Sequence, residues 1–491
     1  MLQHKIYERA RLSRDARFDG QFYVGVRTTG IYCRPICPAV APKSENVTFY
    51  PSAAAASEAG FRPCLRCRPE CAPGTPAWSG TSTTVRRGLR LIANGALDDG
   101  SIEQLAERLG VTSRHLRRLF TTHLGASPLS VAHTQRLQFA KRLIDQTNMP
   151  MTHVAEAAGY RSARRFNDTF KKTYGRSPRD LRRRREETFN RNSALTVRLS
   201  YRKPFDWRAM MGFLAVRATP GVEQVISDTY LRSITIDGQS GVIECRHVDR
   251  DESISLTLHG IGTTVMFQVV QRVREMLDLD APLADIGEVL STDKVLGSLL
   301  LGSPGIRVPG AWDGFELTVR AILGQQVSVK AASTLAGRVA KRYGEIVELP
   351  TSLASRAEEL SLARLFPTPE KLLHARFKDL GIVTSRCASI RSVAGAVVRG
   401  DINFDNTQDP DDFCRALMSI PGIGEWTAQY CAMRALKHPD AFPASDLGLL
   451  RAVDDSGKVS AAELKSRAES WRPWRAYAAL LLWGSLAGSG G

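Results

Sequence analysis

The hydrophobic positions of this sequence change their spacing along the chain, which predicts parts with different secondary structure. Between residues 101 and 178, two similar copies each contain a short apolar-periodic segment, a glycine turn and a second segment rich in basic residues, which indicates paired helices. Further on, apolar and polar residues alternate in segments that predict antiparallel strands. These segments are 195–201, 230–236 and 253–258.

Helical periodicity returns twice in the second half of the chain. It predicts a helix over 205–218, which would pack on one face of the sheet. It also predicts an almost entirely helical stretch over 312–436, with Gly and Pro at the breaks. The expected fold class is therefore multidomain, mainly α with α+β parts.

Domain boundaries follow from these changes of period. The chain of 491 residues is long enough for about three domains or more. Residues 73–82 are rich in Pro, Gly, Ser and Thr and predict a linker. The basic linkers of the chain predict that its domains are loosely coupled. The expected domains are a four-cysteine domain at 1–78, a paired helix-turn-helix bundle at 79–185, an antiparallel-sheet α+β domain at 195–300 and an all-α domain at 301–491.

Composition indicates the kind of partner. The formal net charge is +17 and the pI is 9.7, which favours a polyanion, with nucleic acid as the first expectation. No uninterrupted apolar run reaches membrane-spanning length, and the first residues begin no secretory signal. We therefore expect double-stranded DNA as the partner, no membrane, and a cytoplasmic location.

Cysteines cluster near the N-terminus in a pattern that predicts a metal site. Cys33 and Cys37 form one short chelating pair, and Cys64 and Cys67 form a second. Zinc favours tetrahedral thiolate sites built from two such pairs, so we expect one Zn²⁺ held by all four sulfurs. On spacing alone, a purely structural zinc site is favoured over a reactive one. Cys71 lies outside the set and has no assigned role.

The residues around these cysteines resemble the N-terminal domain of Ada proteins. The matching segments are FDGQFYVGVRTTGIYCRP (18–35), ENVTFY (45–50) and AGFRPCLRC (59–67). The resemblance implies that the first cysteine of the set, Cys33, accepts a methyl group from a DNA methylphosphotriester. Zinc would keep the sulfur deprotonated at neutral pH, and methylation would leave a less negative face for the phosphate backbone.

The internal repeat places a basic helix at the end of each helix-turn-helix copy, where Arg can contact the major groove. The doubled arrangement resembles the DNA-binding domain of AraC-type transcription activators. That resemblance implies promoter DNA and RNA polymerase as partners, and two such helices on one chain predict a monomer. The DNA-contacting residues expected are Arg114, Arg117 and Arg118 in the first copy and Arg164 and Arg165 in the second.

Residues 418–449 contain the pattern around which the C-terminal half is organised. Ile420–Gly424 (IPGIG) predicts a tight turn between two helices, with Gly422 and Gly424 supplying backbone freedom. The second helix would begin near Glu425 and present unpaired N–H groups to a DNA phosphate. Asp446 follows in a loop, where a helix cap is the ordinary role of a lone aspartate.

This stretch resembles the helix-hairpin-helix of base-excision DNA glycosylases, and specifically the AlkA-type 3-methyladenine glycosylases. The resemblance also covers 205–218, 320–332 and 470–483. It implies that Asp446 is the catalytic carboxylate and that Gln325 and Gln326 lie at the DNA-contacting wedge position, where Gln326 matches the residue that enters the stack. It further implies a pocket for the flipped base, lined by Phe213, Trp426, Tyr430 and Trp483. Trp471, Trp474 and Tyr477 are expected in the core.

Departures from the family refine the expected reaction. Trp426 stands where glycosylase-lyases carry a Schiff-base lysine, so we expect a monofunctional enzyme that does not nick DNA. No cysteine follows Cys431, so we expect no iron–sulfur cluster. Leu447 and Gly484 replace aromatic residues of some members, which predicts a roomier pocket.

The sequence thus predicts a bacterial, nucleoid-associated alkylation-damage response protein with two activities, namely methyl transfer to Cys33 that activates transcription and hydrolysis of the glycosidic bond of 3-methyladenine-type purines. A rival interpretation is a transcription regulator whose C-terminal half binds damaged DNA without catalysis. A third is a regulator with a structural zinc and no methyl transfer.

Overall fold

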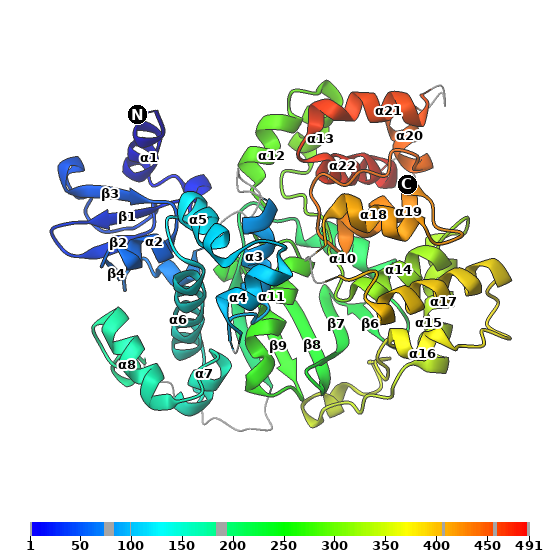
Figure 1. Ribbon diagram of the computed structural model, residues 1–491, viewed down its shortest axis with the longest axis horizontal. Coiled ribbons are helices and arrows are strands. Elements are labelled where there is room, and N and C mark those ends of the chain that lie inside the picture. The colour runs from blue at the N-terminus through cyan, green and yellow to red at the C-terminus, as the bar shows by residue number, and fades with distance from the viewer. Residues whose placement is uncertain are drawn as a thin grey trace. The chain divides into compact units, whose positions relative to one another are not determined.

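The chain divides into two compact units in the computed structural model, which describes residues 2–72, 83–98, 100–182, 194–404, 408–454 and 459–488. The first unit comprises Met1–Arg202, Arg250–Thr257 and Ile261–Gln271, and the second comprises the remainder. Figure 1 shows the helices and strands of the chain, coloured by residue number. The predicted linker at 73–82 lies outside the described residues.

A small sheet with four strands in the order β3-β1-β2-β4 carries the cysteines of the first unit. β1 pairs antiparallel with β2 and β3, and β2 pairs parallel with β4. Aromatic side chains pack against this sheet, and the ring of Tyr7 stacks on the ring of Phe22 with 4.1 Å between the ring centroids. The elements are α1 (Leu2–Ser13), β1 (Tyr23–Val26), β2 (Ile31–Cys33), β3 (Val47–Tyr50), α2 (Ala53–Glu58) and β4 (Arg62–Pro63).

The predicted repeat forms two helix-turn-helix copies of the same design. In each, a hydroxyl side chain (Thr112, Ser162) caps the second helix, and a left-handed glycine (Gly125, Gly175) ends it. The helices are α3 (Thr83–Ala93), α4 (Ile102–Arg108), α5 (Ser113–Leu124), α6 (Pro128–Gln146), α7 (Met151–Ala157), α8 (Ala163–Tyr174) and α9 (Pro178–Leu181).

The cysteine-bearing part and the first helix-turn-helix copy share one hydrophobic core, contrary to the loose coupling expected from basic linkers. Ala54 and Ala55 of α2 pack in the same cluster as Leu116 and Phe120 of α5. The Ser52 hydroxyl also donates a hydrogen bond to the carbonyl of Leu124, at 2.8 Å. Small alanine side chains allow this close approach, and linker composition carries no information about it.

The second unit contains an antiparallel meander of β6 (Glu223–Ile226), β7 (Thr229–Ile236) and β8 (Gln239–Val248). Asp237 and Gly238 join β7 to β8 with φ of 47° and 75°, as a two-residue hairpin turn requires. β5 (Leu195–Ser200), in the first unit, pairs with β9 (Ser253–His259), of which residues 253–257 belong to the same unit. β6 and β8 were absent from the sequence prediction.

Helices account for most of the remaining chain. No helix among the described residues is long and apolar enough to cross a membrane. In chain order they are α10 (Trp207–Ala215), α11 (Met266–Met276), α12 (Leu283–Leu290), α13 (Lys294–Gly302), α14 (Gly314–Leu323), α15 (Val329–Tyr343), α16 (Pro369–Leu373), α17 (Thr384–Arg399), α18 (Pro410–Met418), α19 (Glu425–Arg434), α20 (Leu447–Val453), α21 (Ala461–Arg467) and α22 (Arg475–Gly488).

Candidate functional site

The predicted hairpin joins α18 to α19. Gly422 has φ of 87°, and a Cβ added there would lie 2.5 Å from the hydroxyl oxygen of Ser389. That hydroxyl donates to the carbonyl of Pro421 at 2.7 Å, so it holds the turn against α17. Gly424 is the N-cap of α19 and offers no side chain, which leaves the first N–H groups of the helix for an external anion.

Asp446 lies where three N–H groups converge on its carboxylate. Oδ2 accepts a hydrogen bond from the indole Nε1 of Trp426 at 2.7 Å. Oδ1 accepts from the indole Nε1 of Trp483 at 2.9 Å and from the backbone N–H of Leu449 at 3.0 Å. Asp446 is therefore the N-cap of α20, which is the ordinary role of an aspartate at this position. In addition, the hydrogen bonds from the two indoles orient its carboxylate beside aromatic rings.

The expected pocket rings form one contiguous group around this carboxylate. Trp426 and Tyr430, one turn apart on α19, stack with ring centroids 5.1 Å apart and an interplanar angle of 8°. Tyr430 meets Trp483 edge to face at 6.4 Å. All three residues are half-buried, so part of each stays accessible. By contrast, Trp471, Trp474 and Tyr477 are buried in the core, as predicted.

Two arginines, which the sequence analysis did not identify, lie against the ring of Phe213 of α10, and one of them also contacts Tyr430. The guanidinium carbon of Arg217 lies 3.8 Å from the Phe213 ring centroid, and that of Arg434 lies 4.9 Å away. Arg434 also donates a hydrogen bond to the hydroxyl of Tyr430 at 2.6 Å. A signal was present in the sequence, because Arg434 follows Tyr430 by one helical turn.

The two glutamines expected at the DNA wedge have different surroundings. Gln325 donates from Nε2 to the carbonyl of Gly422 at 2.9 Å and to the hydroxyl of Thr427 at 3.3 Å, so its side chain ties the loop to the hairpin. Gln326 is exposed and has φ of 54°. Left-handed backbone at a non-glycine residue is uncommon and here turns an exposed side chain outward at the loop tip.

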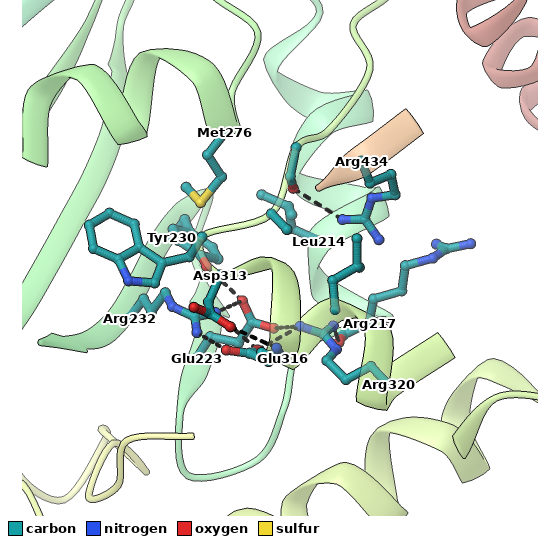
Figure 2. Close-up of a pocket in the computed structure, with 14 residues that line it drawn as sticks. Leu214, Arg217, Glu223, Tyr230, Arg232, Met276, Asp313, Glu316, Arg320 and Arg434 are labelled. Carbon is teal, nitrogen blue, oxygen red and sulfur yellow. Dashed lines mark hydrogen bonds and ion pairs between the residues drawn. The ribbon is translucent and has the colours of Figure 1, made fainter. Parts of the chain in front are cut away.

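A buried cluster of charges lies beside α10, and Figure 2 shows its two glutamates between two arginines. Arg232 and Arg320 each pair with both Glu223 and Glu316. Burial alone would raise the pKa of Glu223, but the nearby Arg320 and Arg232 lower it to about 2. The adjoining cavity of about 20 Å³ has room for about one water molecule.

The four predicted zinc ligands converge in the first unit. The sulfur atoms of Cys33, Cys37, Cys64 and Cys67 lie within 4.8 Å of one another. A Zn–S bond of about 2.3 Å places tetrahedral sulfurs about 3.8 Å apart, so the donor set fits zinc. Cys64 and Cys67 are buried, whereas Cys33 and Cys37 are half-buried. The backbone N–H of Arg34 donates to the Cys67 sulfur at 3.3 Å, which weakens that sulfur as a nucleophile.

The basic residues expected at the DNA face lie on α5 and α8 with exposed side chains. Arg117 pairs across the copy with Glu103 at 3.3 Å, and Arg118 contacts the ring of His115 at 3.0 Å. Phe166 and Phe170 occupy the opposite, buried face of α8. The exposed residues are Arg114, Arg117, Arg118, Arg164 and Arg165.

Four family models match successive parts of the chain. They are the metal binding domain of Ada (residues 7–70), a helix-turn-helix domain (105–184), the AlkA N-terminal domain (196–313) and the HhH-GPD superfamily of base excision DNA repair proteins (319–476).

Individual relatives match either the whole chain or one part of it. A probable bifunctional transcriptional activator/DNA repair enzyme AlkA from Mycobacterium tuberculosis is 40% identical over 97% of this chain and 95% of its own length. DNA-3-methyladenine glycosylase 2 of Escherichia coli is 32% identical over 58% of this chain and 95% of its own. The solved 3-methyladenine DNA-glycosylase of Archaeoglobus fulgidus, 24% identical, covers 59% of this chain and 97% of its own with a TM-score of 0.50, which supports the fold of this part alone.

Proposed function

Because this chain belongs to the family of bifunctional AlkA-type transcriptional activators and DNA repair enzymes, we propose that it carries out both activities on alkylated DNA. In the second unit it hydrolyses the glycosidic bond of alkylated purines, in the manner of a DNA-3-methyladenine glycosylase II. In the first unit it transfers a methyl group from a DNA methylphosphotriester to Cys33. The observation that carries the first proposal is the Asp446 carboxylate among three aromatic rings.

The geometry around Asp446 suits the excision of a flipped nucleotide. When the bond between C1′ and the base nitrogen breaks, the electron pair leaves with the base and positive charge develops on the sugar. The Asp446 carboxylate, held by two indole N–H groups, stabilises that charge and can orient the water that adds to C1′. The water passes a proton to the Asp446 carboxylate as the new bond forms.

DNA is held by the hairpin and by the loop before α15. The open N-terminus of α19 binds a backbone phosphate, and Gln326 enters the stack that the flipped base leaves. Trp426, at the position where lyases use a lysine, has no amine for a Schiff base. The proposed product is therefore an abasic site in an unbroken strand.

Methyl transfer in the first unit uses Cys33 as the acceptor. When bound, Zn²⁺ would keep the thiol deprotonated at neutral pH. The Cys33 sulfur then forms a bond to the methyl carbon, the carbon–oxygen bond of the phosphotriester breaks, and its electron pair stays on the phosphate oxygen. The half-buried position of Cys33 supports this assignment over the buried Cys64 and Cys67.

The methylated first unit acts as a transcription activator. Loss of one negative charge at the cysteine cluster favours contact with the phosphate backbone, and α5 and α8 contact successive major grooves. We propose promoter DNA and RNA polymerase as partners, a monomeric protein, and one zinc ion per chain. The exposed arginines of both helices support the DNA part of this proposal.

The test is base release from methylated duplex DNA by the full-length protein and by Asp446→Asn, with products separated by chromatography. We expect release of 3-methyladenine by the wild type and a loss of about 10²–10³-fold in the variant, with DNA binding retained. Asp401→Asn, an exposed change at the end of α17, serves as the control and should behave as wild type.

Two results would change the assignment. Undiminished release by Asp446→Asn would remove Asp446 from the catalytic role. No release by any of the three proteins, with binding intact, would favour the rival interpretation, in which the second unit binds damaged DNA without cutting it.

A further inference from the structure

Arg434 is a buried cation that forms no ion pair with a carboxylate in the part of the chain that the structure describes. Only 4% of the residue is exposed. Its guanidinium donates from Nε to the carbonyl of Pro309 at 2.8 Å and from Nη2 to the carbonyl of Gly310 at 3.2 Å. Nη1 donates to the hydroxyl of Tyr430 at 2.6 Å. All three acceptors are neutral oxygens, so among the described residues the guanidinium of Arg434 is held without a direct ion pair.

Arg217, which is half-buried, brings a second positive charge to the ring of Phe213. Its guanidinium carbon lies 3.8 Å from the Phe213 centroid, in direct contact with the ring face. Within the described parts of the chain, neither Arg217 nor Arg434 pairs with an acidic side chain. Glu223 and Glu316, which line the same pocket, form their ion pairs with Arg232 and Arg320, as Figure 2 shows.

The candidate site therefore has two electrically different ends. Asp446 places a carboxylate against Trp426 and Trp483. Arg217 and Arg434 place two guanidinium groups against Phe213 and Tyr430. A cation bound to an aromatic ring draws electron density toward itself, so the rest of the ring attracts a second cation less.

We propose that Arg217 and Arg434 are specificity residues that stabilise negative charge on the departing base and favour neutral modified purines over cationic ones. This inference rests on the proposed glycosylase activity. As the bond from C1′ to the base nitrogen breaks, the base gains one unit of negative charge while the sugar gains one unit of positive charge. The guanidinium groups stabilise the negative charge that develops on the base, and Asp446 stabilises the positive charge that develops on the sugar.

The two classes of lesion respond differently to this arrangement. A neutral base such as hypoxanthine meets no repulsion on binding and gains stabilisation as it leaves. A cationic base such as 7-methylguanine in DNA gains the same stabilisation as it leaves, but the guanidinium charges oppose its binding. The arginines therefore raise the second-order rate constant for neutral lesions and have little net effect for cationic ones.

The experiment uses full-length protein and duplex oligonucleotides that contain a single hypoxanthine or a single 7-methylguanine. Single-turnover rates are measured over a range of protein concentrations for wild type, Arg217→Gln and Arg217→Lys, with Arg399→Gln as an exposed control at the end of α17. Arg217 is half-buried, so its replacement is a milder change to the fold than that of Arg434. Arg434→Gln provides a second variant.

We expect Arg217→Gln to lower the ratio of second-order rate constants, hypoxanthine over 7-methylguanine, by about tenfold, and Arg217→Lys, which keeps the charge, to remain near wild type. With 7-methylguanine the maximal rate of Arg217→Gln should fall while its half-saturating concentration also falls. Equal losses on both lesions, or a lysine variant as impaired as the glutamine variant, would assign Arg217 to packing alone and overturn the proposal. No release of either base by the wild type would instead overturn the glycosylase function itself, and this inference with it.

Discussion

At the scale of single residues, two buried carboxyl groups of the second unit have pKa values shifted in opposite directions, because only one of them has arginines close enough to outweigh burial. Glu223 has two arginines beside it and its pKa falls to about 2. Asp278 accepts hydrogen bonds from the hydroxyl of Tyr477 at 2.8 Å and from the N–H of Val308 at 3.1 Å. Burial nevertheless raises the pKa of Asp278 to about 6, only partly opposed by Arg307.

The raised pKa of Asp278 predicts a pH-dependent gain in stability for Asp278→Asn. Because the folded pKa exceeds the unfolded one, the contribution of Asp278 to stability is fully present below about pH 4 and is lost as pH rises through about 6. An amide keeps one oxygen for both donors and never ionises. We expect the variant to gain about 2 kcal/mol over wild type at pH 8, relative to the difference at pH 4.

Denaturant unfolding at pH 4 and pH 8 measures this difference in the free energy of unfolding between Asp278→Asn and wild type. Glu223→Gln is the matched comparison and should show the opposite sign, because removing one member of a buried pair costs about 3–5 kcal/mol where the wild-type glutamate is ionised. A constant difference between Asp278→Asn and wild type at both pH values would contradict the assignment.

At the scale of elements, the turn between α18 and α19 depends on one of its two glycines. Gly422 has a left-handed backbone and no room for a Cβ, because Ser389 is fixed by its bond to Pro421. Gly424 has φ of −97°, and an added Cβ there would meet nothing within 4 Å. The two positions therefore differ in what they tolerate.

We predict that Gly422→Ala lowers stability by about 1–2 kcal/mol and weakens DNA binding, because the turn must shift to relieve the strain. Gly424→Ala should leave stability nearly unchanged and serves as the control. Thermal unfolding and titration with duplex DNA at two salt concentrations measure both effects. Equal stability losses in the two variants would show that the turn conformation is not the cause.

At the scale of the molecule, each proposed activity lies within one unit. The cysteine cluster shares a core with the first helix-turn-helix copy in the first unit. Asp446, Trp426 and Trp483 all belong to the second unit. Zinc binding energy should therefore stabilise the DNA-binding helices of the first unit, whereas base release should not depend on it.

Zinc removal tests this division. A chelator should lower the unfolding temperature of the first unit and weaken its binding to duplex DNA, while base release persists. Re-addition of zinc should restore both properties. After incubation with methylphosphotriester DNA, mass spectrometry should find one added methyl group on Cys33 and none in Cys33→Ser. Absence of the methyl group in the wild type would favour the third interpretation, a structural zinc alone.

The sequence alone was sufficient where local spacing determines chemistry. The two short cysteine pairs converge as their spacing predicts, and the glycine turn with capped helices repeats. Trp426 and Tyr430 share a helical face because they lie one turn apart. The strands it missed have a physical reason as well. β8 is buried on both faces along its middle, so its side chains do not alternate between apolar and polar.

Only the tertiary structure determined what residues distant in sequence do to one another. The residues next to Asp446 in the sequence predict only a helix cap. Folding brings the indole N–H groups of Trp426 and Trp483 to its carboxylate. The sequence analysis did not identify Arg217 and Arg434, because only folding places both guanidinium groups beside Phe213. Secondary structure and local spacing follow from backbone geometry, so the sequence alone predicts them. The energy with which a charged group interacts depends on its burial and its neighbours, which only the folded chain supplies.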